Sequence, residues 1–148
     1  MNDSINLERF VKAQQEYGTF QTALAEIRNG HKETHWMRYI FPQMIGLGSS
    51  STSEYYAIRS LEEAKAFLND PYLGGNLREI SQALLELNDS NASSIFGWPD
   101  NLKLKSSMTL FVPTLFVVAA GEDSVFAKVL DKFFGGEYDA WTLNKLGR

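Results

Sequence analysis

The 148-residue sequence contains no cysteine, and this absence removes several classes of function at once. Disulfide bonds, thiolate nucleophiles and cysteine-ligated zinc are excluded, and a small secreted disulfide scaffold is a poor description of the chain. Histidine is also scarce, because the chain has only His31 and His35. A catalytic metal bound by both would need an acidic third ligand, with Asp100 and Asp139 as candidates by polarity alone. We therefore predict no metal and no other cofactor.

A surplus of basic charge is missing as well. The sequence has 14 Lys and Arg residues against 18 Asp and Glu residues, which gives a formal net charge of −4. Proteins that bind nucleic acids usually carry a basic surplus or a clear basic face. The locally basic positions are Arg28, Lys32 and Arg38 in one group and Lys103 and Lys105 in another. Each group is large enough for one phosphate or carboxylate, so we predict no nucleic-acid partner.

No apolar run is long enough to cross a membrane. The most apolar stretch, residues 108–120, contains Pro113 and is shorter than the roughly 20 apolar residues of a membrane-spanning helix. Residues 1–7 contain polar side chains and an acid where a secretory signal would have a basic start and an apolar core. We therefore expect a soluble, cytoplasmic protein with no membrane partner.

What is present is the composition of a globular protein, with 44% hydrophobic and 22% charged residues. The length suits one domain, and residues 1–148 contain no repeat, linker or low-complexity tract. Apolar residues recur at helical spacing, most clearly in residues 20–27 and 125–134, and no stretch alternates long enough to require a sheet. We predict an all-α fold, a single compact multi-helical domain of about seven or eight helices with orthogonal-type packing.

Capping residues predict where several helices begin. Asn6 is a candidate cap for the first helix, and Ser60-Leu-Glu-Glu63 is a capping box for another. Pro71 suits the first turn of the helix that follows. Asp139 is predicted to cap a last helix over residues 140–146.

Two predicted helices, residues 32–41 and 102–120, carry most of the candidate chemistry. Pro42 disfavours helical backbone at the residue before it, so the first helix should end at position 41. The second helix contains Pro113, which removes one helical hydrogen bond, and we expect a kink or break near residues 111–113. A strand is the alternative for this second stretch, because of its β-branched residues and the same proline.

Residues 30–51 concentrate polar side chains beside aromatic rings more strongly than any other stretch. His35, next to Trp36, could act as a general base near neutral pH, or it could hydrogen-bond to backbone and fix the helix. The loop Gly46-x-Gly48-Ser49-Ser50-Ser51 could bind an anion through backbone N–H groups, or it could be a flexible turn. It matches neither the P-loop nor the dinucleotide-binding fingerprint.

A second group of polar residues surrounds the start of the apolar helix. It consists of Lys103, Lys105, Ser106, Ser107 and Thr109. Helix N-termini attract anions, and the lysines would strengthen that attraction. The alternative is a solvated helix start capped by serine. The serine pair does not fit the Gly-x-Ser-x-Gly pattern of a hydrolase nucleophile.

Several motifs resemble one protein family over nearly the whole chain. They are Arg9-Phe10-Val11-x-Ala13-Gln14, His35-Trp36-Met37 followed by Phe41-Pro42-Gln43, Gly46-Leu47-Gly48-x-Ser50, Lys103-Leu104-x-Ser106-Ser107-Met108-Thr109-Leu110-Phe111 and Gly136-x-x-Asp139-x-x-Thr142-Leu143. Together they resemble the domain-of-unknown-function family 1810, some members of which are labelled calpastatin. The resemblance implies a mostly helical single domain and implies no activity. Arg38 and Asn76 depart from the family pattern, in which an aromatic residue and an arginine are expected.

Three hypotheses about function follow. The first is one pocket for a small anionic ligand, with nucleotide-like ligands included. Its candidate ligand-binding residues are Trp36, Arg38, Tyr39, Gln43, Ser50, Lys103, Ser106 and Ser107. The second is a hydrolase that uses His35 as general base and Asp139 as an acidic partner. The third is a protein-interaction module without catalytic activity, so the sequence leaves open whether the protein is an enzyme, and it gives no oligomeric state.

Overall fold

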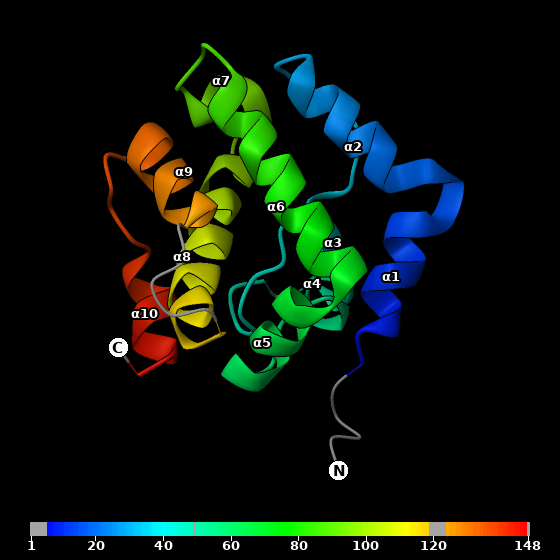
Figure 1. Ribbon diagram of the computed structural model, residues 1–148, viewed down its shortest axis with the longest axis vertical. Helices are drawn as coiled ribbons and strands as arrows, with labels where there is room; N and C mark the ends of the chain where they lie inside the picture. The colour runs from blue at the N-terminus through cyan, green and yellow to red at the C-terminus, as the bar shows by residue number, and fades with distance from the viewer. Residues whose placement is uncertain (1–5, 49, 119–123, 148) are drawn as a thin grey trace.

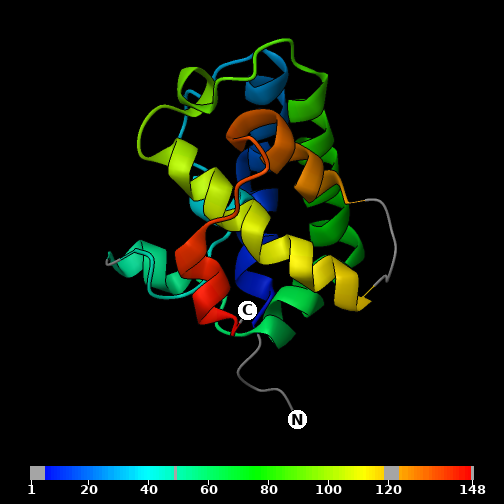
Figure 2. The ribbon, with the colours of Figure 1, turned by 90° about the vertical axis from the view of Figure 1, so that its left-hand side faces the viewer.

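Two long helices, α6 (Pro71–Glu86) and α8 (Asp100–Val118), run through the middle of the molecule in the computed structural model (Figure 1). The structure describes residues 6–48, 50–118 and 124–147, without the side chains of residues 113–118. α5 (Leu61–Asn69) and α9 (Val125–Phe134) each pack against both α6 and α8 and so join them. α2 (Thr19–Arg28) also packs against α6, and α10 (Ala140–Lys145) lies against α8 (Figure 2).

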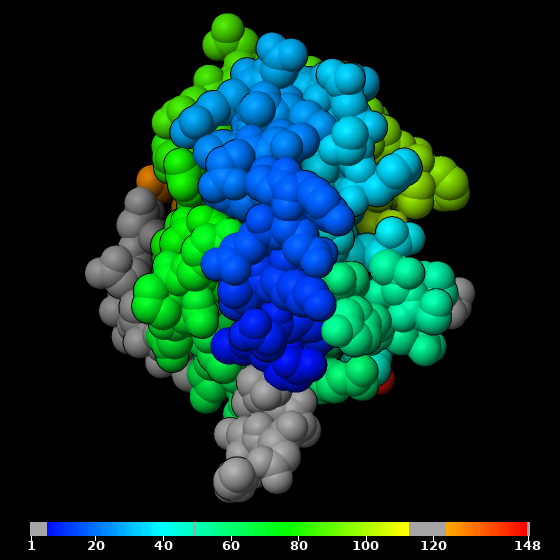
Figure 3. Space-filling model, turned by 90° about the vertical axis from the view of Figure 1, so that its right-hand side faces the viewer, coloured from blue at the N-terminus to red at the C-terminus, as the bar shows by residue number. Residues whose placement is uncertain are grey.

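The N-terminal helices form one face of the molecule. α1 (Glu8–Gln15), the 3₁₀ turn η1 (Glu16–Gly18) and α2 form a helical hairpin, which Figure 3 shows as a continuous blue surface beside α6. Figure 1 shows that the helices cross one another rather than forming a parallel bundle. Among the described helices, none combines the length and the apolar character that crossing a bilayer requires.

Three further helices are very short. α3 (Met37–Ile40) has four residues, and α4 (Ser51–Tyr55) and α7 (Ala92–Phe96) have five residues each. Because of these short helices, the described residues form more helices than the seven or eight expected. In the described parts of the chain, β-structure is limited to one isolated bridge between Met44 and Ile58. The prediction of a single all-α domain is confirmed.

Most of the predicted helix starts are confirmed by side-chain caps. Ser60 Oγ accepts a hydrogen bond of 3.1 Å from the Glu63 N–H at the start of α5. Asp70 caps α6, in which Pro71 occupies the first turn. Asp139 caps α10, as the sequence predicts. Short polar side chains before apolar helical stripes therefore located these helices correctly.

Three local predictions differ from the structure. Asn6 does not cap α1, which follows Leu7 and has no side-chain cap. The helix expected over residues 32–41 is reduced to α3, because the Glu26 carboxylate accepts hydrogen bonds from the N–H groups of residues 33 and 34 and holds them in a loop. α8 runs as one helix from Asp100 to Val118, so of the kink or break expected near residues 111–113 the break is absent. Burial of apolar residues along α8 offsets the hydrogen bond that proline removes.

A chain of buried phenylalanines links the first helix to the ninth. Phe10 of α1 contacts Phe67 of α5 with ring centroids 5.1 Å apart. Phe67 contacts Phe111 of α8 at 5.5 Å, and Phe111 contacts Phe126 of α9 at 5.9 Å. Such ring pairs contribute about 0.5–1.5 kcal/mol each beyond the area they bury. The aromatic content of the sequence is therefore used mainly in the core.

A buried ion pair ties α1 to α5 and to the segment between α4 and α5. The Arg9 guanidinium lies 2.9 Å from the Glu63 carboxylate, and both side chains are almost fully buried. Arg9 also donates hydrogen bonds to the carbonyls of Tyr55 at 2.7 Å and Ala57 at 2.8 Å. Removing one partner of such a pair leaves an uncompensated buried charge, which costs about 3–5 kcal/mol. Arg9 therefore fixes residues 55–57, which directly precede Ile58.

Two adjacent glycines in α6 differ sharply in their surroundings. A Cβ atom on Gly74 would lie 2.1 Å from the carbonyl oxygen of Leu68 and 2.9 Å from Arg78 Nη1. A Cβ atom on Gly75 would have no atom within 4 Å. Only Gly74 therefore permits the close approach of α6 to the end of α5.

This contrast gives a matched test of the packing. Gly74→Ala should destabilise the protein by about 1–3 kcal/mol, because the backbone of α5 must move. Gly75→Ala should stabilise it by about 0.5–1 kcal/mol, because alanine is the better helix former. Urea unfolding followed by circular dichroism measures both. Equal effects of the two substitutions would contradict the described crossing of α5 and α6.

Candidate functional site

The segment after α3 is fixed in place by hydrogen bonds to Ile58. The Ile58 N–H donates to the Gln43 carbonyl at 2.8 Å, and the Ile45 N–H donates to the Ile58 carbonyl at 2.9 Å. Phe41 and Met44 are buried in the core, so the segment is also held by its apolar side chains. Residues 43–48 therefore form a defined wall rather than a free loop.

A cleft of about 340 Å³ lies between this wall, the first turns of α8 and the residue that precedes α10. The residues that line it are Gln43, Leu47, Gly48, Pro99, Leu102, Lys103, Ser106 and Asp139. We call it the Lys103 cleft. Four residues that the sequence singles out thus meet in one place, from three parts of the chain: Gln43, then Lys103 and Ser106 of α8, and Asp139.

Two glycines allow the wall to take this shape. Gly46 has a φ of +106°, which residues with a side chain rarely adopt, and a Cβ atom there would lie 3.0 Å from the Trp141 ring. Gly48 packs so closely on Ser53 that a Cβ atom there would lie 2.5 Å from the serine Cβ. The Gly-x-Gly pattern therefore has a conformational cause and a packing cause. Ser49, the next residue of the predicted anion-binding loop, lies outside the described residues.

Lys103 shares its counter-ion with a second lysine. Its Nζ lies 3.3 Å from one oxygen of Asp100, whose other oxygen lies 3.0 Å from Lys32 Nζ. Lys32 is almost fully buried and also lies 5.0 Å from the centroid of the Trp36 ring. One carboxylate therefore balances two ammonium groups, which leaves a positive charge at this end of the cleft.

Asp139 is held rigidly at another side of the cleft. Its Oδ2 accepts hydrogen bonds from the Thr142 N–H at 3.0 Å and the Thr142 hydroxyl at 2.5 Å. Its own N–H donates to Thr109 Oγ1 at 2.8 Å, and Thr109 donates to the Lys105 carbonyl at 2.8 Å. Within the described part of the chain, Asp139 Oδ1 has no hydrogen-bond or ion-pair partner. One carboxylate oxygen is therefore available.

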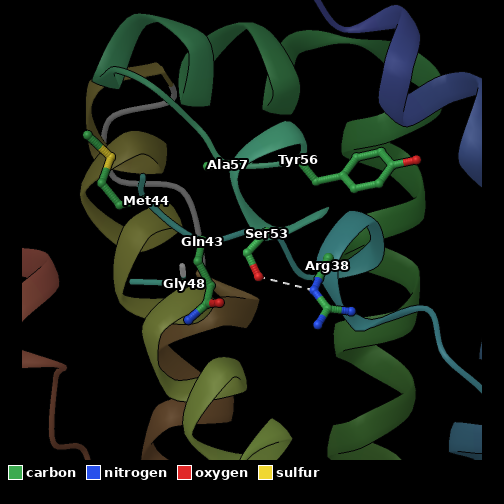
Figure 4. Close-up of a pocket in the computed structure, with 7 residues that line it drawn as sticks. All are labelled: Arg38, Gln43, Met44, Gly48, Ser53, Tyr56 and Ala57. Atoms are coloured by element: carbon green, nitrogen blue, oxygen red, sulfur yellow. Dashed lines mark hydrogen bonds between the residues drawn. The ribbon is translucent and has the colours of Figure 1, made fainter. Parts of the chain in front are cut away.

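Arg38 lies at a second, much smaller hollow that adjoins the cleft. This hollow of about 10 Å³ has room for about one water molecule, and Gln43 and Gly48 line both spaces. Figure 4 shows the Arg38 guanidinium beside the Ser53 hydroxyl, to which Nε donates at 3.2 Å. No carboxylate of the described residues pairs with Arg38. Arg38 therefore adds a half-buried positive charge close to the cleft.

Trp36 belongs to the core and does not line the cleft. Only 1% of the residue is exposed, and its ring packs against Phe41 and Phe96. The indole N–H donates to a Glu26 carboxylate oxygen at 2.8 Å. A stacking role for Trp36 or Phe41 would therefore require these rings to leave the core.

His35 and Tyr39 also lie away from the cleft lining. Tyr39 donates a hydrogen bond of 3.1 Å to the His35 carbonyl, and burial together with the neighbouring Tyr56 and Glu16 raises the pKa of the Tyr39 hydroxyl. The His35 imidazole is exposed and has no partner among the described residues. Asp139 lines the cleft and His35 does not, so the structure does not bring the two proposed catalytic residues together there.

Two serines that the sequence predicts as ligand-binding residues, Ser50 and Ser107, do not lie in the cleft lining. Ser50 caps α4, where its Oγ accepts from the Ser53 N–H at 3.1 Å. Ser107 is fully buried, and its hydroxyl has no hydrogen-bond partner in the described parts of the chain. Neither residue lines the Lys103 cleft.

Some residues of the cleft were not singled out from the sequence. They are the apolar residues Leu47, Pro99 and Leu102. A signal for two of them was present, because positions 99, 102, 103 and 106 share one face at helical spacing. Among the described residues, no three His, Asp or Glu side chains are placed to hold a metal ion.

Comparison with known proteins identifies relatives but no activity. The family model described as "Protein of unknown function (DUF1810)" matches residues 4–146. The crystal structure of the conserved hypothetical protein Rv1873 from Mycobacterium tuberculosis is similar over 99% of both chains, with 39% sequence identity and a TM-score of 0.89. No curated protein matches the chain.

The Glu26 carboxylate provides a test of how residues 33–36 are held. Burial opposes its ionisation, but hydrogen bonds from Thr34, Glu33 and Trp36 outweigh burial and lower the pKa of Glu26 from 4.5 to about 2. A carboxylate with a lowered pKa in the folded protein stabilises it above the unfolded pKa, and this contribution is lost as the pH falls from about 4.5 towards 2.

Glu26→Gln should therefore destabilise the protein by about 1 kcal/mol at pH 7, a value that allows for solvent screening. The difference in unfolding free energy between this variant and the wild type should be smaller at pH 3. Below the unfolded-state pKa, the unfolded chain binds a proton at Glu26, and part of the stability that the ionised carboxylate contributes is lost. Urea unfolding at both pH values checks this. A difference that is the same at pH 7 and pH 3 would show that the charge of Glu26 is unimportant.

Thr109 and Ser107 form a matched pair of buried hydroxyls on α8. Thr109→Val should cost about 1–3 kcal/mol, because the N–H of Asp139 loses its acceptor. Ser107→Ala should leave stability unchanged or raise it slightly, because that hydroxyl has no partner. Chemical unfolding of the two variants measures the contrast. A large loss in Ser107→Ala would point to a partner that the described contacts do not include.

Proposed function

We propose that this chain, which belongs to the DUF1810 family, binds a small anionic ligand in the Lys103 cleft. The observation that carries this proposal is the meeting of Gln43 with Lys103 and Ser106 of α8, which lie about 60 residues further along the chain, in one cleft of about 340 Å³. That volume lies at the small end of the range of about 300–1,000 Å³ that is typical of ligand pockets. The proposed ligand is therefore a small metabolite rather than a polymer.

The charges around the cleft support an acidic group at the Lys103 end. Lys103 and Lys32 share the single carboxylate of Asp100, so Lys103 is only partly neutralised. Its side chain is 23% exposed and lines the cleft. Lys103 also lies in the first turns of the 19-residue helix α8, where the helix dipole favours a negative charge.

The remaining lining suits a ligand with a polar end and an apolar body. The Gln43 amide can donate a hydrogen bond to an acidic group, whereas Leu47, Pro99 and Leu102 present hydrocarbon. Phosphorylated metabolites and nucleotide-like ligands combine these two features. We propose in addition that the protein binds this ligand in the cytoplasm.

The other two hypotheses have less support. No contact in the described residues activates His35 as a general base, so hydrolase activity stays a prediction from the sequence. The protein-interaction hypothesis would use exposed apolar residues such as Trp98, of which 79% is exposed, and it also stays a prediction.

Ligand binding can be tested with simple probes. Inorganic phosphate, pyrophosphate and adenosine monophosphate at millimolar concentration should raise the melting temperature of the wild-type protein, because a ligand that binds only the folded state stabilises it. Lys103→Met should weaken binding by about tenfold, the effect of losing one charge-assisted hydrogen bond.

Lys12→Met is the matched control, because Lys12 is an exposed lysine of α1 that does not line the cleft. Its binding constants should equal those of the wild type. Absence of any shift with all three probes, or equal weakening in both lysine variants, would rule against the proposed site.

A further inference from the structure

The Lys103 cleft has a negative side as well as a positive one. Lys103 and Asp139 both line it, yet they are too far apart to form an ion pair. In the part of the chain that the structure describes, the Asp139 carboxylate has no cationic partner. A ligand with only acidic groups would leave this carboxylate uncompensated and would be repelled by it.

The hydrogen bonds of Ser106 and Asp139 also favour a ligand that carries a hydrogen-bond donor. The Ser106 hydroxyl donates its proton to the Leu102 carbonyl at 3.2 Å, so its oxygen is left with acceptor capacity only. Asp139 Oδ2 is occupied by Thr142, whereas Oδ1 is free to accept. The lining of one cleft therefore combines residues with donors, Lys103 and Gln43, and residues with free acceptor capacity, Ser106 and Asp139.

We infer that the ligand is a small zwitterion, with an acidic group bound by Lys103 and a protonated amine bound by Asp139. This inference rests on the proposed function and specifies the class of ligand for the same cleft. The amine would donate to Asp139 Oδ1, and the Ser106 oxygen would accept a second hydrogen bond from the same end of the ligand. The N–H of Asp139 is held by Thr109 at 2.8 Å, so the carboxylate is positioned before the ligand arrives.

Three related probes separate the contributions. Ethyl phosphate carries the acidic group alone, O-phosphoethanolamine adds a protonated amine, and phosphocholine adds a positive charge without an N–H donor. Titration of the wild-type protein, followed by isothermal calorimetry or by NMR chemical shifts, should show O-phosphoethanolamine binding about tenfold more tightly than ethyl phosphate. Phosphocholine should fall between them, because it keeps the charge and loses the hydrogen bond.

Asp139→Asn tests the role of the carboxylate, because asparagine keeps a capping oxygen for α10 while the charge is removed. This variant should bind ethyl phosphate as well as the wild type or better, and its preference for O-phosphoethanolamine should fall to about twofold or less. Asp70→Asn is the matched control, since Asp70 caps α6 through the same side-chain group and does not line the cleft. It should keep the full preference.

Each outcome is decisive. If ethyl phosphate and O-phosphoethanolamine bind the wild type equally well, the zwitterion inference is overturned while the anion site stands. If no probe binds, both the inference and the proposed function fall. If the preference survives in Asp139→Asn, the amine is recognised elsewhere and the assignment to Asp139 is wrong. Should Asp139→Asn fail to fold, the order of the three probes in the wild type still decides the inference.

Discussion

The two backbone hydrogen bonds between residues 43–45 and Ile58 are the constraint on which the candidate site depends. They join two irregular segments that have no helix of their own to hold them. Arg9 stabilises this junction, because it donates hydrogen bonds to the carbonyls of Tyr55 and Ala57. Its own charge is paired with the buried Glu63 carboxylate. An ion pair in the N-terminal half of the core thus helps to position a wall of the cleft.

The charged side chains at the cleft lie at the starts of helices, which fix their positions. Asp100 begins α8 and Asp139 precedes α10, so both carboxylates occupy positions that helix starts favour for local reasons. A residue that caps a helix is held in one conformation by backbone N–H groups. The same interaction that stabilises α10 therefore also orients the proposed ligand contact at Asp139. In the sequence, Asp139 can be recognised only as a helix cap.

The sequence was sufficient for the architecture and for part of the site. Helical periodicity, the caps at Ser60 and Asp139 and the position of Pro71 located the starts of α5, α10 and α6, because these signals are local. The shortening of the helix over residues 32–41 could not be foreseen, since Glu26 acts on it from a different helix. The burial of Trp36 could not be foreseen either, because an aromatic ring beside polar residues looks the same in a sequence whether it faces solvent or core.

The hydrogen bond between Asp139 and Thr109 has a consequence for motion at the end of the chain. α10 has six residues and would be marginal as an isolated helix, so this bond to α8 is an important restraint on its fraying. Local opening of α10 would withdraw Asp139 from the cleft without disturbing the core. Amide hydrogen exchange in α10 thus measures how often this helix opens and removes Asp139 from the cleft lining. A ligand bound to Asp139 would slow that exchange.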